Sequence, residues 1–324
     1  MKNNILVLGG AGFIGSNVCG YLLNNKDNFV ICVDNLYTGD IKNISNYISN
    51  PRFLFMKHDI TEPFEIPVPV NKIYNFACPA SPKHYQKDPI FTAKTNFIGT
   101  LNMLEIAKKY HAIFLQASTS EIYGNPLEHP QKENYLGNVN SVGPRSCYDE
   151  GKRIAETLCK DFHSLYGVDT KIVRIFNTYG PNMLPNDGRV ISNFICQALR
   201  ELPLYIYGDG EQTRSFCYIT DLIDGIERMV NSELHGPINL GNPEEISVVM
   251  LADMVLKMTK SKALLKRKSL PVDDPVKRKP DITEAKEKLG WEPKILLVDG
   301  LDKTIRYFRE NILSFPYQIE NDKL

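Results

Sequence analysis

Short, mostly hydrophobic runs alternate with longer amphipathic stretches along the first half of the chain. Runs of this length and composition are typical of strands buried on both faces of a parallel sheet. They cover residues 5–8, 29–33, 53–56, 112–117 and 171–176. Amphipathic stretches lie between them, and two of these predict helices over residues 89–110 and 145–166. The alternation predicts an α/β protein whose parallel sheet carries helices on both faces.

The pattern changes after Tyr179, where proline and glycine become denser and the chain becomes less regular. A chain of 324 residues is large for a single core, so one main domain with a smaller lobe is the expected division. There is no internal repeat and no low-complexity segment.

A glycine-rich turn follows the first hydrophobic run. Gly9, Gly12 and Gly15 are spaced as G-x-x-G-x-x-G, directly after a predicted strand and at the start of a predicted helix. In such a turn the first glycine allows a sharp bend, the second lets the backbone approach a pyrophosphate, and the third lets the helix pack on the strand. The N-terminus of the helix then offers free N–H groups to the phosphates. The turn therefore predicts a dinucleotide site.

Asp34 ends the second hydrophobic run and indicates which dinucleotide is bound. A carboxylate here accepts hydrogen bonds from ribose hydroxyls and repels a 2′-phosphate, which favours NAD over NADP. The alternative is a glycine turn from an unrelated fold, with Asp34 capping a loop. The order of strand, turn, helix, strand and acid favours the NAD site.

Tyr148 and Lys152 form a Tyr-x-x-x-Lys pair that lies one turn apart on one face of the helix predicted over 145–166. A tyrosine has an ordinary pKa of about 10, but a nearby ammonium group and a positive nicotinamide ring both favour the phenolate. Such a tyrosine takes a proton from a sugar hydroxyl as hydride leaves the carbon. Thr119, which follows the run 112–117, is placed to hold the same oxygen. The alternative is a surface Tyr/Lys pair on an amphipathic helix.

With these motifs the chain resembles the extended short-chain dehydrogenases/reductases. Within that group, from residue 5 to about 308, it closely resembles the UDP-glucuronic acid decarboxylases, also called UDP-xylose synthases. The resemblance implies a Rossmann-type doubly wound sheet. The segments that carry it are 9–16, 34–39, 79–82, 94–96, 117–124, 143–153, 174–181, 186–190 and 273–281. The last segment and Ser118–Glu121 are the most specific, and Cys78 departs from the family, which commonly has serine there.

The resemblance implies oxidation of C4 of UDP-glucuronic acid by NAD+, with Tyr148 taking the hydroxyl proton. The resulting β-keto acid loses CO2, C5 is protonated, and hydride returns to C4 to give UDP-xylose. NAD is therefore regenerated in each cycle. Matching positions imply that Glu121 acts as acid or base at C5 and that Arg278 binds the substrate carboxylate. The alternative for Glu121 is a loop carboxylate paired with a nearby cation. The alternative for Arg278 is that Lys277-Arg278-Lys279 is a solvated basic run, which the residues alone favour because charge runs are usually solvated.

The expected site residues fall into three sets. The catalytic set is Tyr148, Lys152, Thr119, Glu121 and Arg278. The NAD-binding set is Gly9, Gly12, Phe13, Ile14, Gly15, Asp34, Asn35, Tyr37, Thr38, Gly39, Asp59, Ile60, Phe76, Ala77, Cys78, Thr95, Ala117, Tyr148 and Lys152, with Asp59 expected at the adenine amino group. The substrate set is Lys94, Ser120, Glu121, Asn177, Arg189, Tyr205, Tyr207, Gln212, Arg214 and Arg278.

Four alternatives to this function are weighed at this point. A related enzyme releases the UDP-4-keto-pentose, and no residue here distinguishes it. A 4,6-dehydratase carries an Asp-Glu pair where this chain has Ser120-Glu121, and a 4-epimerase has no use for a carboxylate clamp. A non-enzymatic NAD(H) sensor usually lacks the Tyr-x-x-x-Lys pair.

The resemblance also implies the domain division and the assembly. The NAD-binding domain is expected over residues 1–177 plus about 236–242, where the chain returns to the sheet. The sugar-nucleotide lobe is expected over about 178–235 and 243–324. The helices over 89–110 and 145–166 are expected to form a four-helix bundle in a homodimer.

Composition predicts a cytoplasmic protein. Lys plus Arg and Asp plus Glu are both 38, so no net field attracts nucleic acid or an anionic membrane. No apolar run reaches the roughly 18 residues that cross a bilayer, and the first strand starts too early for a signal peptide. The seven cysteines contain no Cys-x-x-Cys pair, which favours a reducing compartment. The six histidines show no metal-ligand spacing, so no metal is expected.

Overall fold

Seven parallel strands form the central sheet of the computed structural model, which describes residues 3–185, 188–269 and 277–311. The strand order is β11-β6-β5-β4-β1-β2-β3, the doubly wound arrangement of a Rossmann-type fold. The strands are β1 (Asn3–Leu8), β2 (Asn28–Asp34), β3 (Phe53–Lys57), β4 (Lys72–Asn75), β5 (Ile113–Thr119), β6 (Thr170–Ile175) and β11 (Pro237–Leu240). The predicted α/β class and parallel sheet are therefore confirmed.

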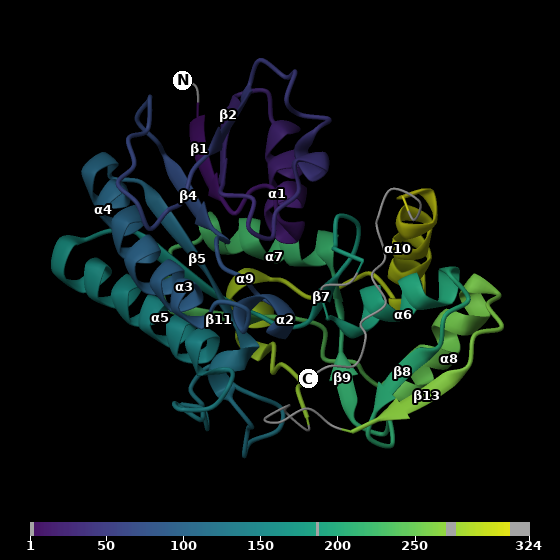
Figure 1. The fold of residues 1–324 in the computed structure, drawn as a ribbon. Coiled ribbons are helices and arrows are strands. Elements are labelled where there is room, and N and C mark those ends of the chain that lie inside the picture. Colours follow the sequence, from purple (N-terminus) through teal and green to yellow (C-terminus); the bar gives the residue numbers. More distant parts are fainter. Residues whose placement is uncertain (1–2, 186–187, 270–276, 312–324) are drawn as a thin grey trace.

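Side chains alternate between two hydrophobic cores, one on each face of the sheet. Ile5 and Val7 of β1 belong to one core with residues of α1 (Phe13–Leu23) and α7 (Ile219–Val230). Leu6 and Leu8 belong to the other, with residues of α4 (Thr100–Tyr110) and α5 (Ser146–Tyr166). Figure 1 shows α4 and α5 on one side of the sheet and α1 and α7 on the other. Burial on both faces explains why these strands are hydrophobic throughout.

The predicted helix over 89–110 is interrupted by a π-helical turn. It comprises α3 (Pro89–Lys94), the turn Thr95–Gly99 and α4. Single π turns inside helices are frequent at functional sites, and this one buries Thr95 and Asn96. Strand β4 was not predicted, because it is only four residues long and polar at both ends.

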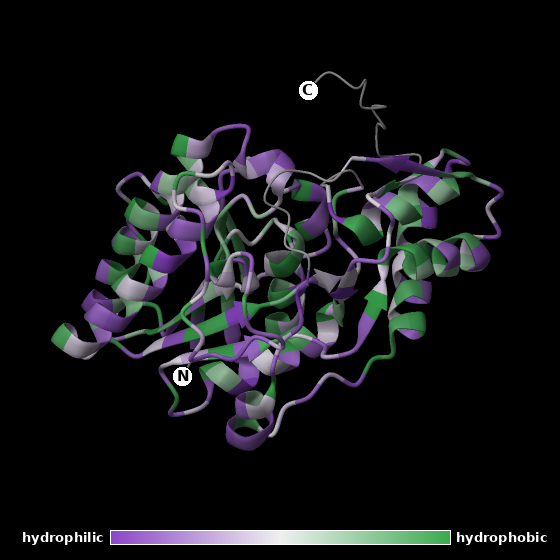
Figure 2. Cartoon of the chain, turned by 90° about the horizontal axis from the view of Figure 1, so that it is seen from below, coloured by the Kyte–Doolittle hydropathy of each residue, from purple (hydrophilic) through white to green (hydrophobic). Residues whose placement is uncertain are grey.

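The second half of the chain forms three two-stranded sheets and five further helices among the described residues. The sheets pair β7 (Thr178–Tyr179) with β10 (Cys217–Tyr218), β8 (Leu204–Tyr207) with β13 (Leu265–Lys268), and β9 (Thr213–Ser215) with β12 (Glu245–Ser247). The five helices are α6 (Val190–Leu199), α7, α8 (Val248–Thr259), α9 (Thr283–Leu289) and α10 (Leu297–Asn311). The short helix α2 (Pro82–Tyr85) belongs to the first half. The outer helices mix hydrophobic and hydrophilic residues along their turns, as amphipathic helices do (Figure 2).

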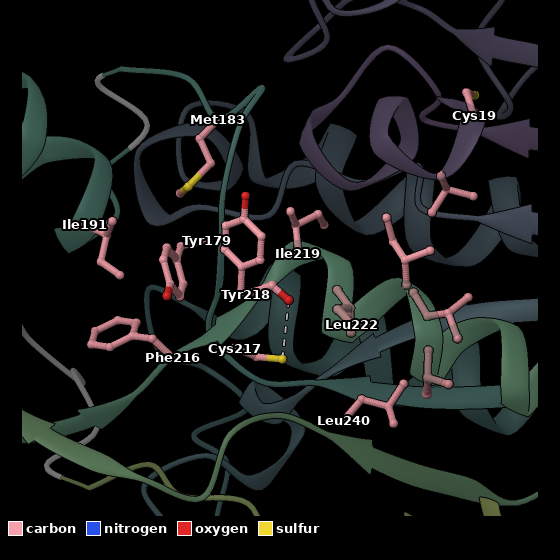
Figure 3. Close-up of a cluster of buried hydrophobic side chains, with 14 of the residues drawn as sticks. Cys19, Tyr179, Met183, Ile191, Phe216, Cys217, Tyr218, Ile219, Leu222 and Leu240 are labelled. Carbon is pink, nitrogen blue, oxygen red and sulfur yellow. Dashed lines mark hydrogen bonds between the residues drawn. The ribbon is translucent and has the colours of Figure 1, made fainter. Parts of the chain in front are cut away.

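One hydrophobic core joins this second half to the sheet. It runs from Leu240 of β11 and Leu222 of α7 to Tyr179, Phe216 and Ile191. Figure 3 shows these side chains packed as one group, with the Cys217 thiol directed at the carbonyl of Tyr218 at 3.7 Å. The two halves therefore share one hydrophobic core.

Two segments that support the family resemblance lie partly outside the described residues. These are 186–190, of which 186–187 are not described, and 273–281, of which 273–276 are not described. Among the described helices, none combines the length and apolar character needed to cross a membrane. The described residues also contain no group of three His, Cys, Asp or Glu side chains that could hold a metal ion.

Candidate active site

A cavity of about 800 Å³ opens at the carboxyl ends of the central strands. Its walls come from the turn after β1, the ends of β2, β4, β5 and β6, the start of α5, and parts of α6, β8 and β9. Ligands of open α/β sheets bind at this edge, where the strand order reverses. Tyr179, Met183, Ile191 and Phe216 form part of the wall on the side of the second half (Figure 3).

The glycine turn has the geometry that its spacing predicts. Gly9 has φ = +70°, and a Cβ atom there would lie 2.9 Å from the backbone N of Ala77. A Cβ on Gly15 would lie 2.2 Å from the Gly9 carbonyl oxygen, so only glycine allows α1 to pack this closely. Helix α1 begins after Gly12 with no side-chain cap on its first N–H groups. This end of α1 faces the cavity and is suited to a pyrophosphate.

Asp34 lies buried at the end of β2, beside the glycine turn. Its carboxylate accepts hydrogen bonds from the N–H of Ala11 at 3.0 Å and of Leu36 at 2.8 Å. Burial raises the pKa of Asp34, and these backbone bonds oppose the rise. Each carboxylate oxygen retains a further lone pair, so the group can also accept ribose hydroxyls. Gly39 packs directly on this carboxylate but does not line the cavity.

Asp59 follows β3 and also faces the cavity. Its carboxylate accepts from the side-chain amide of Asn35 at 2.9 Å and from the hydroxyl of Thr61 at 2.8 Å. Burial alone would raise its pKa, but the hydrogen bonds from Thr61 and Asn35 outweigh burial and lower it. Apart from Gly39, all residues of the predicted NAD-binding set line the cavity. The donor and acceptor set therefore fits a dinucleotide.

Tyr148 lies in the first turn of α5, buried at 5% exposure and stacked on Tyr85 with ring centroids 5.0 Å apart. Burial, followed by the nearby Cys78 thiol, raises its pKa above the ordinary value, while a hydrogen bond with Thr119 acts in the opposite direction. The Lys152 ammonium group lies 5.8 Å from the Tyr148 ring centroid and donates to the carbonyl of Ala117 at 3.0 Å. The protein groups alone therefore favour the neutral phenol.

Buried Arg278 and partly buried Glu121 form an ion pair in the cavity that Tyr148 also lines. Arg278 is 1% exposed, and its guanidinium donates to Glu121 at 3.3 Å, to the Gly124 carbonyl at 3.1 Å and to the Ser120 carbonyl. Lys277, directly before it, is exposed, so the basic run is not uniformly solvated. Arg278 is thereby directed into the cavity beside the end of β5.

Arg145 contacts the same Glu121 carboxylate oxygen as Arg278 does. Burial by itself would raise the pKa of Glu121, but the positive charges of Arg278 and Arg145 outweigh burial and hold it below the ordinary value. Arg145 lines the cavity and was not among the predicted site residues. In the sequence, the one feature that could have indicated Arg145 is its position three residues before Tyr148, at the start of α5.

The predicted substrate residues lie in the cavity with one exception. Ser120, Glu121, Asn177, Arg189, Tyr205, Tyr207, Gln212, Arg214 and Arg278 all line it, whereas Lys94 does not. Lys94 is exposed on α3, because consecutive residues of a helix face different directions and its neighbour Thr95 turns inward. Tyr85 and Lys268 also line the cavity and were missed, since no motif marks either residue.

Comparisons with known proteins agree with this geometry. The family described as GDP-mannose 4,6 dehydratase matches residues 6–304. UDP-glucuronic acid decarboxylase 1 of Arabidopsis thaliana is 53% identical over 310 residues, covering 96% of this chain and 71% of that protein. UDP-glucuronic acid decarboxylase 6 of the same plant is 53% identical over 305 residues, covering 94% and 88%.

Solved structures agree as well. UDP-glucose 4-epimerase of Thermotoga maritima, solved with UDP-glucose, has a TM-score of 0.88 and 31% identity, and the match covers 95% of this chain and 99% of that one. UDP-glucuronic acid 4-epimerase of Bacillus cereus, solved with UDP-glucuronic acid and NAD, has a TM-score of 0.84 and 30% identity, with coverage of 95% and 99%. The chain belongs to the extended short-chain dehydrogenase/reductase family, in the group of the UDP-glucuronic acid decarboxylases.

Proposed function

We propose that the protein is an NAD-dependent UDP-glucuronic acid decarboxylase that forms UDP-xylose and CO2. The observation that carries the proposal is the pairing of buried Arg278 with Glu121 in the cavity that Tyr148 lines, in a chain 53% identical to an enzyme of that name. A guanidinium at the sugar end of the cavity suits a substrate that carries a carboxylate there. Neither a neutral hexose nor a 6-hydroxyl requires such a group. The Bacillus cereus 4-epimerase solved with UDP-glucuronic acid also binds a carboxylated sugar, so the expectation that a 4-epimerase has no use for a carboxylate clamp does not hold, and loss of C6 is what separates the two reactions.

NAD is the cofactor, and the turn 9–15, Asp34 and Asp59 are the residues that would hold it. When bound, NAD+ takes up hydride from C4 of the sugar and returns it at the end of the cycle. Tight retention of NAD is part of the proposal, because a regenerated cofactor has no need to leave.

Tyr148 is the proposed acid–base residue at the C4 hydroxyl, with Thr119 holding the same oxygen. The hydrogen bond between Thr119 and Tyr148 favours the phenolate and fixes the distance between the two oxygens that face the substrate. Lys152 supports this arrangement from its bond to the Ala117 carbonyl, within reach of the Tyr148 ring. Because burial opposes the phenolate, an added positive charge in the site would favour proton abstraction.

Arg278 is proposed to hold the substrate carboxylate, and Glu121 to handle the proton at C5. Both side chains come from segments next to the end of β5, so they meet the same part of the sugar as Thr119 does. Once C4 is a ketone, the C5–C6 bond breaks readily because its electrons enter the carbonyl system. Glu121, kept ionised by two arginines, must gain a proton before it can donate one.

The nucleotide end of the substrate is proposed to lie against the second half of the chain. We propose that Asn177 and Arg189 bind the diphosphate. Tyr205, Tyr207 and Gln212 are proposed to contact the nucleoside, and Arg214 is proposed to lie between the nucleoside and the sugar. All six line the cavity, and β9 brings Arg214 directly beside Arg278. Lys94 is not included because it lies outside the cavity.

We also propose the two-part division at about residue 177, with 236–242 returning to the NAD-binding part, and a homodimer. Support for the division is that β11 is an edge strand of the central sheet. Support for the dimer is that α3 and α4 pack along α5 while Phe97 and Ile154 remain 45% and 36% exposed. None of the seven cysteines, all of which lie among the described residues, forms a disulfide, which supports a cytoplasmic location.

Product analysis tests the function. Purified protein is incubated with UDP-glucuronic acid and substoichiometric NAD+, with UDP-glucose as the control substrate, and products are identified by NMR. We expect UDP-xylose, CO2 and no lasting NADH. A hydrated 4-keto-pentose with accumulating NADH would instead mean that the final reduction is uncoupled. Conversion of UDP-glucose alone would overturn the assignment.

A further inference from the structure

The main chain on the C-terminal side of Arg278 is fixed to a segment far away in sequence. The N–H of Gln131 donates to the Lys279 carbonyl at 2.9 Å, and the N–H of Asp281 donates to the Gln131 carbonyl at 2.8 Å. The Gln131 side chain adds a third bond, because its Oε1 accepts from the N–H of Lys279 at 2.9 Å. Three hydrogen bonds to one residue therefore hold the chain directly after Arg278.

Gln131 is itself anchored to the central sheet. It is fully buried, and its carbonyl also accepts from the side-chain amide of Asn239 in β11 at 3.0 Å. The same amide donates to the Asp281 carbonyl at 3.1 Å, while the Asn239 Oδ1 accepts from the Tyr123 hydroxyl at 2.8 Å. The Gln131 Nε2 donates to the Glu128 carbonyl at 2.7 Å. The oxygen and the nitrogen of both side-chain amides, Gln131 and Asn239, are therefore hydrogen-bonded.

The network continues to helix α5, which bears Lys152. Arg174 of β6 donates to the Tyr123 hydroxyl at 3.0 Å and forms two bonds to the Glu156 carboxylate, at 3.0 and 2.8 Å. Glu156 lies one helical turn after Lys152 and accepts from the Ser118 hydroxyl at 2.5 Å. The anchor of the Arg278 segment is therefore connected to the strand and the helix that carry the proposed proton-transfer groups.

We propose that Gln131, held by Asn239, is a positioning residue that aims Arg278 at the substrate carboxylate and so sets the selectivity for a carboxylated sugar. This inference rests on the proposed function. A guanidinium holds a carboxylate by two parallel N–H bonds only when its plane is correctly oriented. The direction in which a side chain leaves the backbone fixes much of that orientation. Gln131 controls it through the peptide that follows Arg278.

The test compares two ligands that differ in the carboxylate. Binding of UDP-glucuronic acid and of UDP-xylose is measured by calorimetry on the NAD-loaded protein, in a Tyr148→Phe background that blocks turnover. Gln131→Leu keeps the side-chain size but removes both side-chain bonds, and Asn239→Asp keeps the acceptor for Tyr123 but removes both amide donors. Arg278→Met is the reference, and Asn134→Ala, an exposed polar residue of the same segment, is the matched control.

We expect Gln131→Leu and Asn239→Asp each to weaken UDP-glucuronic acid about tenfold and UDP-xylose by less than about twofold. Combining either with Arg278→Met should add no further loss, because both changes act through the same contact. The ratio of the two affinities, UDP-glucuronic acid over UDP-xylose, is compared between variants. If Gln131→Leu and Asn239→Asp weaken both ligands equally, or leave this ratio unchanged while Arg278→Met lowers it, only the positioning role is overturned. If Arg278→Met also leaves the affinity ratio of the unmodified Arg278 protein unchanged, Arg278 does not hold the substrate carboxylate. That result would overturn both this part of the proposed function and the present inference.

Discussion

Glu121 and Arg278 are 157 residues apart in sequence, and their side chains meet at 3.3 Å in the wall of the cavity, where the Arg278 side chain is buried and that of Glu121 is 19% exposed. The pair joins the end of β5 to the last segment before α9. Arg145 approaches the same Glu121 oxygen, so Glu121 keeps a cationic partner if a second carboxylate takes its place on Arg278. Under the proposed function, the substrate carboxylate replaces the Glu121 carboxylate as the partner of Arg278.

Arg278→Met should weaken UDP-glucuronic acid binding by at least about 30-fold, because a buried charge-assisted contact is lost. UDP-xylose, which has no carboxylate, should bind within about twofold of the unmodified protein. Calorimetry with each ligand measures the two affinities. Loss of both affinities together would show that Arg278 supports the fold and does not select the substrate.

Tyr148 gives a pH-dependent prediction. Burial raises its pKa above the ordinary value, and a positive nicotinamide nearby should lower it. Because the phenolate is the active base, activity should increase with pH until the pH passes the pKa in the loaded protein. The phenolate absorbance, taken as the difference from Tyr148→Phe, should therefore titrate at lower pH with NAD+ than without it. Identical titrations would contradict this role for the cofactor charge.

Asp149 should make stability depend on pH. It is buried with one carboxylate oxygen lacking a hydrogen bond, and burial together with the Glu121 charge raises its pKa to about 7. An acid with a raised pKa in the folded state binds protons more tightly when folded, so its contribution to stability falls as pH rises from about 4 to about 7. Asp149→Asn should therefore raise the melting temperature at pH 8 and change it little at pH 4. A loss of stability at pH 8 would rule out this account.

Gly15→Ala should destabilise the protein by about 1–3 kcal/mol, because the added methyl would meet the backbone of the glycine turn. Gly236→Ala is the matched control, since no atom lies within 4 Å of the position of its Cβ. Thermal unfolding of both variants measures the difference. Equal stability of the two would show that α1 can move away from β1 without cost.

The central strands and the glycine turn could be predicted from sequence because they depend on local pattern. Strand β4 was missed, since its four residues carry too little hydrophobic pattern to register. Gln131 could not be found in this way, and Arg145 was marked only by its position three residues before Tyr148. Their importance comes from contacts with Glu121 and Lys279, and only the folded chain brings these segments together.

Lys94 is the opposite case, because it was predicted to bind substrate but lies exposed outside the cavity. A lysine beside the cavity residue Thr95 is an attractive partner for an anion, yet helical geometry turns it outward. Arg278 has exposed Lys277 as its neighbour and is itself buried, because paired extended segments on both sides direct alternate residues inward. Sequence alone does not fix which member of a charged run faces the site.

The most direct measurement is turnover of UDP-glucuronic acid in D2O, followed by NMR of the product. Hydride that leaves C4 and returns to C4 does not exchange with solvent, whereas the proton delivered at C5 comes from it. We expect UDP-xylose with protium at C4 and one deuterium at C5. Deuterium at C4, or a product that retains C6, would contradict a closed cycle of oxidation, decarboxylation and reduction in one site.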